Sequence, residues 1–423
     1  MTPAHYDVVV IGGGPGGSTV ATHLARGGLR VGLFEREAFP RFKVGESLMP
    51  ATMLLLERLG ALEPVAKGGF QIKYGASFLD QETGLGHTFY FLRGMPWPNW
   101  TYNVPRAEFD TILLEHSRKQ GVHVHQPAIV TRVALDAHGV DVEAESGGER
   151  AVHRARFLVD ASGRDGFLAG RLGRRQRVPN LGKVALFAHF RGADRFPGVE
   201  EGNIRLNLFD GGWFWWIPFT HDVTSIGAVL HARTVREHAG TPEDLFDTMV
   251  HRCDAVRERL ARAERVTPIH RVANFAYTNT PVVGDRFLAV GDAVAFIDPI
   301  FSSGVFVAMR SAELASEAIL AAFASDRFSA RQFAAYERRV WRGVAPFFKF
   351  IHKYYEPAFL DLFLGPKNIF GMVTAVLNVL SGGCFIRTPL RVRFALAVLF
   401  GLTRIRTWAR RRAGLSVESR LEW

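Results

Sequence analysis

The stretch that decides the fold covers residues 6–17 and reads YDVVVIGGGPGG. Its first six residues form a short apolar run rich in β-branched side chains, which is typical of a buried parallel strand. The residues after the glycines, STVATHLARGG (18–28), carry small and apolar side chains at helical spacing and end on a glycine pair that can cap a helix. LRVGLFE (29–35) then predicts a second strand, which finishes on an acid.

This order of strand, glycine turn, helix and strand predicts a dinucleotide-binding unit. Gly12 permits the tight turn, Gly14 lets the backbone approach a pyrophosphate, and Gly17 lets the helix pack on the strand. The phosphates would lie at the positive end of the helix, and Glu35 would accept a hydrogen bond from a ribose hydroxyl. The alternative is a glycine-rich turn that binds no ligand.

Later stretches favour FAD over a nicotinamide dinucleotide. FLVDASG (157–163) and RFLAVGD (286–292) both predict a strand that runs into a turn with an acid, and AVAF (293–296) after the second one has a helical pattern. We expect Asp292 to approach the ribityl chain or its phosphate. With VPRAEFDTILLEHSRKQGV (104–122), these stretches resemble the FAD-dependent monooxygenase superfamily of the para-hydroxybenzoate hydroxylase type. That resemblance places Arg106 near the flavin.

The predicted fold class is α/β, with three regions along the chain. A discontinuous Rossmann-like FAD-binding domain (GR2, para-hydroxybenzoate hydroxylase-like) is expected over 1–80, 104–180 and 275–320. Alternating apolar and polar residues predict an inserted antiparallel β-sheet on the substrate side over 81–103 and 181–274. Residues 321–423 are expected to be helical and to end in a basic tail.

Four short motifs carry a more specific resemblance. GGWFWWIP (211–218) contains WxWxIP, FIDPIFSSG (296–304) fits FxxPxxSxG, and RFKVGES (41–47) with Pro50 fits RxxxGES. GGFQIKYGASF (68–78) places a lysine, Lys73, between the GES turn and the VPR segment. Together they resemble the flavin-dependent halogenases, over roughly residues 5–350.

The resemblance implies a division of labour among these residues. In that family, reduced flavin and O₂ form a hydroperoxide that a halide attacks, which gives hypohalous acid. Wide, rigid indole rings keep organic substrate away from the peroxide. The implied channel wall is Trp213, Trp215, Ile217 and Pro218. The cofactor-binding residues that the motifs add are Arg41, Ser47 and Pro299.

Different residues are expected to bind the halide and the hypohalous acid. The N–H groups of Ser303 and Gly304, at a turn that opens a helix, would bind chloride or bromide. Lys73 would meet the hypohalous acid, either by hydrogen bonding or as a chloramine, and Ser302 would be a second polar group nearby. The structural alternatives are that the tryptophans are core, that Lys73 is a surface lysine, and that the two serines only cap a helix.

Two features limit which substrate could receive the halogen: the residue at position 301 and the charge of the C-terminal tail. Halogenases of free tryptophan have a glutamate immediately before the motif serine, where this chain has Phe301, so free tryptophan is a poor candidate. The net charge is +11, and residues 381–423 hold nine arginines against two glutamates. This tail suits an acidic carrier protein that presents a tethered substrate. A free phenol, an aryl small molecule or a lipid surface stays open, and a separate flavin reductase is the expected source of FADH₂.

Composition and short patterns also limit the location of the protein, its metal sites and its binding to membranes and nucleic acid. The chain has two cysteines, Cys253 and Cys384, which cannot form a CxxC pair, and its start lacks an export-signal pattern, so a cytoplasmic location is expected. The fifteen histidines form no HxxxH or HExxH pattern, so no metal site is expected. The late apolar stretches 369–380 and 394–402 are too short to span a bilayer, although peripheral association stays open. No nucleic-acid-binding pattern accompanies the basic charge.

Two other functions compete with the halogenase. One keeps the fold but changes the reaction, to an aromatic hydroxylase or a reductase of isoprenoid double bonds like the geranylgeranyl reductases. The other is a flavin-binding partner or membrane-surface scaffold without activity.

Overall fold

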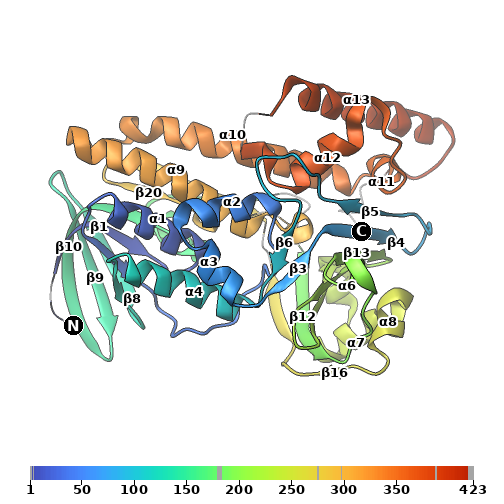
Figure 1. Ribbon diagram of the computed structural model, residues 1–423, viewed down its shortest axis with the longest axis horizontal. Helices are drawn as coiled ribbons and strands as arrows, with labels where there is room; N and C mark the ends of the chain where they lie inside the picture. The colour runs from blue at the N-terminus through green and yellow to red at the C-terminus, as the bar shows by residue number, and fades with distance from the viewer. Residues whose placement is uncertain are drawn as a thin grey trace.

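The apolar run at the start of the chain forms the centre of a parallel sheet. The computed structural model (Figure 1) describes residues 2, 4–178, 183–273, 276–296, 298–385 and 388–417. Strand β1 (His5–Ile11) pairs in parallel with β10 (Glu149–Asp160) on one side and β2 (Val31–Phe34) on the other. The order β19-β20-β10-β1-β2-β7 is completed by β7 (His123–His125), β19 (Val283–Gly284) and β20 (Phe287–Ala289). This sheet is the expected dinucleotide-binding core.

Helices cover this sheet and close the glycine turn. Helix α1 (Pro15–Arg26) packs against α4 (Arg106–Lys119) and α9 (Gly304–Ser325), and α9 also packs on α2 (Pro50–Leu59). A Cβ on Gly17 would lie 1.8 Å from the Gly12 carbonyl oxygen, so only glycine lets α1 approach the end of β1. Gly12 itself has φ +102°, a conformation that favours glycine.

A β-meander extends the sheet on one side. Strands β8 (Ile129–Leu135), β9 (Val140–Ser146) and β10 pair in antiparallel order. The alternation of apolar and polar residues over 122–160 predicts this meander.

A second large sheet is mostly antiparallel. Its order is β16-β12-β15-β14-β13-β4-β5, and β17 also pairs with β12. Its strands are β4 (Gly75–Asp80), β5 (Gly86–Tyr90), β12 (Lys183–Arg191), β13 (Ile204–Phe209), β14 (Gly212–Pro218), β15 (Val223–His231), β16 (Glu264–Arg265) and β17 (His270–Ala273). Strand β4 belongs to this sheet although it lies in residues 1–80, which the sequence assigns to the FAD-binding domain. The bounds of the three regions remain predictions.

The tryptophan-rich strand β14 divides its aromatic rings between two cores. Successive side chains of a strand point to opposite faces. Trp213 and Trp215 therefore lie in the large core between the sheet and the C-terminal helices. Phe214 and Trp216 lie in a second core, which α7 (Pro242–Arg252) closes from the other face. Two of the three indoles can thus serve a wall on the inner face, and the third is structural.

Short elements connect the two sheets. Strand β3 (Gln71–Lys73) pairs with β6 (Thr101–Asn103), and β18 (Tyr277–Thr280) lies between β11 (Arg174–Arg177) and β21 (Ala295–Phe296). The other helices are α3 (Leu62–Lys67), α5 (Ala169–Leu172), α6 (Ala232–Glu237) and α8 (Asp254–Leu260).

The helical pattern expected for AVAF (293–296) is wrong. A single 3₁₀ turn, η3 (Gly291–Ala293), follows β20, and Ala295 and Phe296 then pair with Thr278 and Tyr277. An available strand partner therefore overrides the helical spacing of four residues.

The C-terminal region is helical, as predicted. It contains α10 (Ala330–Tyr354), α11 (Pro357–Leu364), α12 (Met372–Leu380) and α13 (Leu390–Arg412). Figure 1 shows α13 at the edge of the molecule, with α11 and α12 between it and strands β4 and β5. Among the described residues, no single helix has the length and apolar character of a membrane span, whereas the bent pair 357–364 and 369–380, at 115°, meets that test together.

Candidate functional site

One large cavity joins the two sheets. Its volume is about 1220 Å³, which exceeds the roughly 300–1,000 Å³ of ordinary small-molecule pockets and suits a dinucleotide. Its lining includes the following predicted residues: Gly12, Gly14, Glu35, Arg41, Ser47, Arg106, Trp213, Trp215, Ile217, Asp292, Pro299, Ser302, Ser303 and Gly304. Gly17, Lys73 and Pro218 lie outside this lining.

The glycine turn is built to accept a phosphate-containing group. Gly14 is the N-cap of α1 and has no side chain, so the first N–H groups of the helix face the cavity without a side-chain cap. Glu35 accepts a 2.7 Å hydrogen bond from the Gly13 N–H and a 2.8 Å bond from the Glu37 N–H. Each carboxylate oxygen keeps a further lone pair for a ribose hydroxyl. The turn therefore fits the dinucleotide that the sequence predicts.

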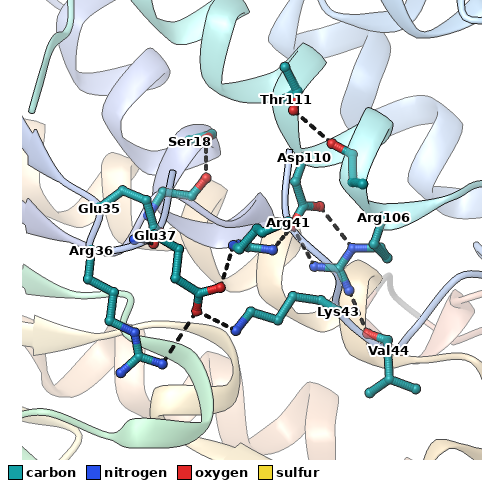
Figure 2. A network of polar contacts seen from close by, with 12 residues as sticks. Ser18, Glu35, Arg36, Glu37, Arg41, Lys43, Val44, Arg106, Asp110 and Thr111 are labelled. Carbon is teal, nitrogen blue, oxygen red and sulfur yellow. Dashed lines mark hydrogen bonds and ion pairs between the residues drawn. The ribbon is translucent and has the colours of Figure 1, made fainter. Parts of the chain in front are cut away.

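Two arginines on the cavity wall share one buried carboxylate (Figure 2). Arg41 Nη1 donates to Asp110 Oδ2 at 2.8 Å, and Arg106 binds both oxygens of Asp110 at 2.8 and 2.9 Å. Arg106 also donates to the Val44 carbonyl at 2.7 Å, which ties α4 to the turn that carries Ser47. Sequence reasoning missed Asp110, although its i, i+4 spacing from Arg106 was a usable signal.

Asp292 lies on the turn η3 and lines the cavity. Burial raises the pKa of its carboxyl to about 6, against the positive charges of Arg106 and Arg164, which lower it. The group is thus poised between its neutral and ionised forms, and it can donate or accept a hydrogen bond to a polar chain in the cavity.

The two inner tryptophans form a continuous wall. Their ring centroids are 6.2 Å apart, with 54° between the planes. Trp215 Nε1 donates to Ser225 Oγ at 3.2 Å, and Trp213 Nε1 donates to the Tyr355 hydroxyl at 3.0 Å. Because both ring N–H groups are engaged by the protein, the indoles offer only apolar surface to the cavity. Pro218 is buried outside the cavity lining, and its carbonyl accepts a 3.0 Å bond from Asn103 Nδ2.

The FxxPxxSxG motif turns the chain into helix α9. Residues Pro299–Phe301 form the 3₁₀ turn η4, Ser302 has φ 56°, and Ser303 is the N-cap of the 22-residue helix. No side-chain cap bonds the first N–H groups of α9, so they and the positive end of the helix dipole can attract an anion. Ser303 and Gly304, which the sequence predicts to bind the halide, lie at the start of this helix and line the cavity.

Lys73 is a buried amine next to the cavity. Its side chain is 2% exposed, and its Nζ donates to Ser47 Oγ at 2.6 Å, while the Phe91 ring lies 5.5 Å away. Burial lowers the pKa of Lys73 to about 7, and no carboxylate forms an ion pair with it among the residues described. Since Ser47 lines the cavity, the amine is one hydrogen bond from its wall.

Phe301 lies in an aromatic cluster away from the cavity lining. Its ring is 5.4 Å from Tyr354, 5.6 Å from Phe350 and 6.3 Å from Phe78. It is buried and offers no hydrogen bond, in contrast to a glutamate at that position. Phe347 and Phe348 of α10 line the cavity, and Phe347 also belongs to the large core with Phe350, Tyr354 and Tyr355.

Sequence reasoning also missed a second buried lysine. Lys183, 1% exposed at the start of β12, has its Nζ 3.9 Å from Asp298 Oδ2 and 3.3 Å from the centre of the Tyr355 ring. The Tyr355 hydroxyl donates to Asp298 Oδ2 at 2.7 Å and accepts from Trp213. Burial lowers the pKa of Lys183 to about 7, and the charge of Asp298 opposes that shift. This chain of contacts holds the tryptophan wall against the motif turn.

The fold and the cavity define a class of protein. A parallel dinucleotide-binding sheet, a glycine turn and a second sheet that closes the cavity are the features of an FAD-dependent oxidoreductase. Within the described chain, no cluster of three or more His, Cys, Asp or Glu side chains could hold a metal ion.

Comparisons with known proteins identify the family. The tryptophan halogenase family model matches residues 7–96 and 91–358, and the chain belongs to this family of flavin-dependent halogenases. The 1H-pyrrole-2-carbonyl-[peptidyl-carrier protein] chlorinase of Pseudomonas fluorescens is 35% identical over 381 residues, which are 84% of this chain and 85% of the relative. These matches favour the halogenase over the hydroxylase or isoprenoid reductase.

Two solved structures share the whole architecture. A flavoprotein/dehydrogenase from Cytophaga hutchinsonii superposes with a TM-score of 0.88 at 28% identity and covers 96% of this chain and 100% of its own. The myxobacterial chondrochloren halogenase CndH, a variant of FAD-dependent halogenases, superposes with a TM-score of 0.80 at 32% identity, with coverages of 95% and 98%. The protein is therefore an FAD- and halide-dependent halogenase.

Proposed function

We propose that Lys73 receives hypohalous acid made in the cavity and delivers its halogen to an electron-rich carbon of a biosynthetic precursor. The observation that carries this proposal is a buried amine that hydrogen-bonds Ser47 on the cavity wall and lacks a carboxylate partner among the described residues. A buried lysine without a counter-ion is costly to the fold, so a chemical role is its best explanation.

The cavity residues prepare the oxidation of the halide. When it is bound and reduced, FAD reacts with O₂ and so supplies the oxidant that converts halide into hypohalous acid. Trp213 and Trp215 keep organic substrate out of this space, and the N–H groups of Ser303 and Gly304 hold chloride or bromide. The arginines Arg41 and Arg106, fixed by Asp110, and the glycine turn bind the cofactor's charged parts.

Lys73 acts through its two protonation states. With a pKa of about 7, a large share of the amine is neutral near neutral pH. Its nitrogen lone pair takes the halogen from hypohalous acid: the N–X bond forms, the O–X bond breaks, and water leaves with an amine proton. The acceptor carbon then takes the halogen and releases a proton, which restores the N–H bond. Ser47 Oγ orients the amine, and Ser302 provides a second polar group.

The proposed acceptor is an aryl or similarly activated group, tethered to an acidic carrier protein. A relative at 35% identity is named for a pyrrole group on a peptidyl carrier protein. Phe301, which has no charge, argues against the amino group of free tryptophan. A separate flavin reductase would supply FADH₂, and the cytoplasm, which suits two unpaired cysteines, is the proposed compartment.

The test is reconstitution with defined acceptors. The protein is mixed with FAD, a flavin reductase, NADH, O₂ and chloride or bromide, and then with pyrrolyl-, aryl- or unloaded carrier protein, a free phenol, or tryptophan. Intact-protein mass spectrometry should show the chlorine isotope pattern on a loaded carrier and not on the unloaded one.

Lys73→Ala is the test variant in this assay, and Lys183→Met, which removes the other buried amine, is the control that should lose far less product. The test variant should abolish halogenated carrier while NADH consumption continues. Equal product from Lys73→Ala, or a product that gains one oxygen or two hydrogens, would refute the mechanism.

A further inference from the structure

The outward side of helix α13 is apolar, the reverse of an ordinary surface helix. Its inner side packs on α11 and α12 and follows helical spacing through Val392, Ala395, Leu399 and Thr403, all of them buried. The opposite side follows the same spacing through Leu390, Phe394, Ala397, Gly401, Ile405 and Trp408. The exposed fractions of Leu390, Phe394, Ile405 and Trp408 are 79, 58, 63 and 55%.

A neighbouring turn extends this surface. The 3₁₀ turn η5 (Ile369–Gly371) exposes Phe370, whose ring lies 6.1 Å from that of Phe394. We define the outer stripe as Ile369, Phe370, Leu390, Phe394, Ile405 and Trp408. Of the fourteen large apolar side chains that are exposed among the described residues, seven lie between positions 369 and 415. The stripe is therefore a concentration of apolar surface, not ordinary scatter.

The stripe has a basic border. Residues 388–417 contain seven arginines and no acidic residue. Arg406 and Arg410 turn inward to Asp361, at 3.4 and 2.8 Å. Arg393, Arg404 and Arg411 are exposed along one side of the stripe and make no ion pair within the described chain. Arg412 lies 4.1 Å over the Trp408 ring.

We propose that α13 lies flat on an anionic lipid surface, with the outer stripe in the boundary between headgroups and acyl chains. Large apolar and indole side chains on one face, with arginines beside them, are the composition of an interfacial helix. Arginines next to the stripe would meet lipid phosphates, which strengthens binding to an anionic surface. This binding is separate from the proposed function and needs no halogenation.

The shape and charge of α13 favour lipid over a folded partner. From Leu390 to Trp408 the stripe is a convex ridge roughly 27 Å long, which a deformable surface can take in along its whole length. A second copy of the chain would bring two sets of arginines together without intervening acids. An acidic carrier protein would match the charge of α13. It would, however, dock on a helix that α11 and α12 separate from strands β4 and β5 (Figure 1), and therefore on the far side of α11 and α12 from the sheet that carries the tryptophan wall.

Vesicle co-sedimentation of the full chain tests the proposal. The wild-type protein should bind vesicles of phosphatidylcholine with phosphatidylglycerol at least tenfold more tightly than phosphatidylcholine alone, and salt should weaken the binding. The double variant Phe394→Glu/Ile405→Glu should lose at least tenfold in vesicle affinity. Arg393→Gln/Arg404→Gln/Arg411→Gln should lose the preference for the anionic lipid.

Matched controls separate the stripe from general effects. Val152, 51% exposed on β10, gives the control Val152→Glu, which should bind vesicles as the wild type does. Circular dichroism and a thermal melt should show the stripe variant to be folded. Wild-type protein that stays unbound, or a stripe variant that binds equally well, overturns the proposal. Two other results would also overturn it when no vesicle binding is seen. One is a wild-type dimer that the stripe variant does not form, and the other is a complex with acidic carrier protein that the stripe variant does not form.

Discussion

Two lysines are buried among the described residues, and only Lys183 lies beside a carboxylate. Lys73 contacts a hydroxyl and a phenyl ring, whereas Lys183 has the carboxylate of Asp298 at 3.9 Å and the ring of Tyr355 beneath it. Burial lowers the pKa of both to about 7. Lys183 therefore offsets a buried negative charge, whereas Lys73 has no such compensation among the described residues, in keeping with the reacting nitrogen that we propose for it.

The largest expected effect separates the two lysines by activity. Lys73→Met should lower the rate of product formation by at least about 100-fold, the scale on which a positioned reacting group acts. Lys183→Met should lose far less, because its amine takes no part in the transfer. Single-turnover product yield, measured by mass spectrometry after preloading with FADH₂, is the readout. Equal losses in the two variants would contradict the comparison.

The next effect separates them by stability. Lys183→Met leaves Asp298 buried without its cation and should lower the free energy of unfolding by about 3 kcal/mol at pH 7. Lys73→Met removes an uncompensated buried amine and should leave the protein as stable as the parent or more so. Urea unfolding of both variants measures this. Destabilisation by Lys73→Met as large as that by Lys183→Met would show that Lys73 is also structural.

A pH series sharpens the assignment for Lys73. Its pKa is about 7 in the folded protein, against 10.5 for an ordinary lysine, so the unfolded chain binds more protons between those values. The contribution of Lys73 to the free energy of unfolding therefore rises with pH through this window and is constant below it. Between pH 7 and 9, the parent should gain about 2 kcal/mol over Lys73→Met. A pH-independent difference in urea unfolding would mean that the amine titrates normally.

The smallest effect concerns the contacts around Lys183. Tyr355→Phe removes the acceptor for Trp213 and the donor to Asp298, and should cost about 1 kcal/mol of stability. Ser225→Ala removes the acceptor of the other indole and serves as the control. Tyr355→Phe should also release more hypohalous acid to a solution trap than Ser225→Ala does, because it breaks the link between the wall and Asp298 as well as the bond of one indole. Equal release of hypohalous acid from both variants would show that the contacts of Lys183, Asp298 and Tyr355 do not help to hold the tryptophan wall.

Local patterns in the sequence predicted the parts of the site that short motifs encode. The glycine turn, the alternating strand β14 and the turn before α9 each depend on neighbours in the chain, and the structure brings their residues to one cavity. Lys183 could not be found in this way because its partners lie 115 and 172 positions away along the sequence. A lysine at the start of a strand looks like a surface residue until the tertiary structure buries it. The AVAF error has a related origin, since Phe296 pairs with Tyr277, which lies outside the four residues whose spacing predicts a helix.

The hydrogen bond between Trp213 and Tyr355 joins residues 142 positions apart. A nascent chain on the ribosome that had emerged as far as β14 would contain the glycine turn, Lys73 and the indoles, but neither α9 nor Tyr355. The turn before α9 and the anchor of Trp213 are thus translated after the indoles themselves. Strand β14 consequently lacks this anchor until translation has passed Tyr355, so the wall of the proposed hypohalous-acid site is fixed only after β14 itself has been made.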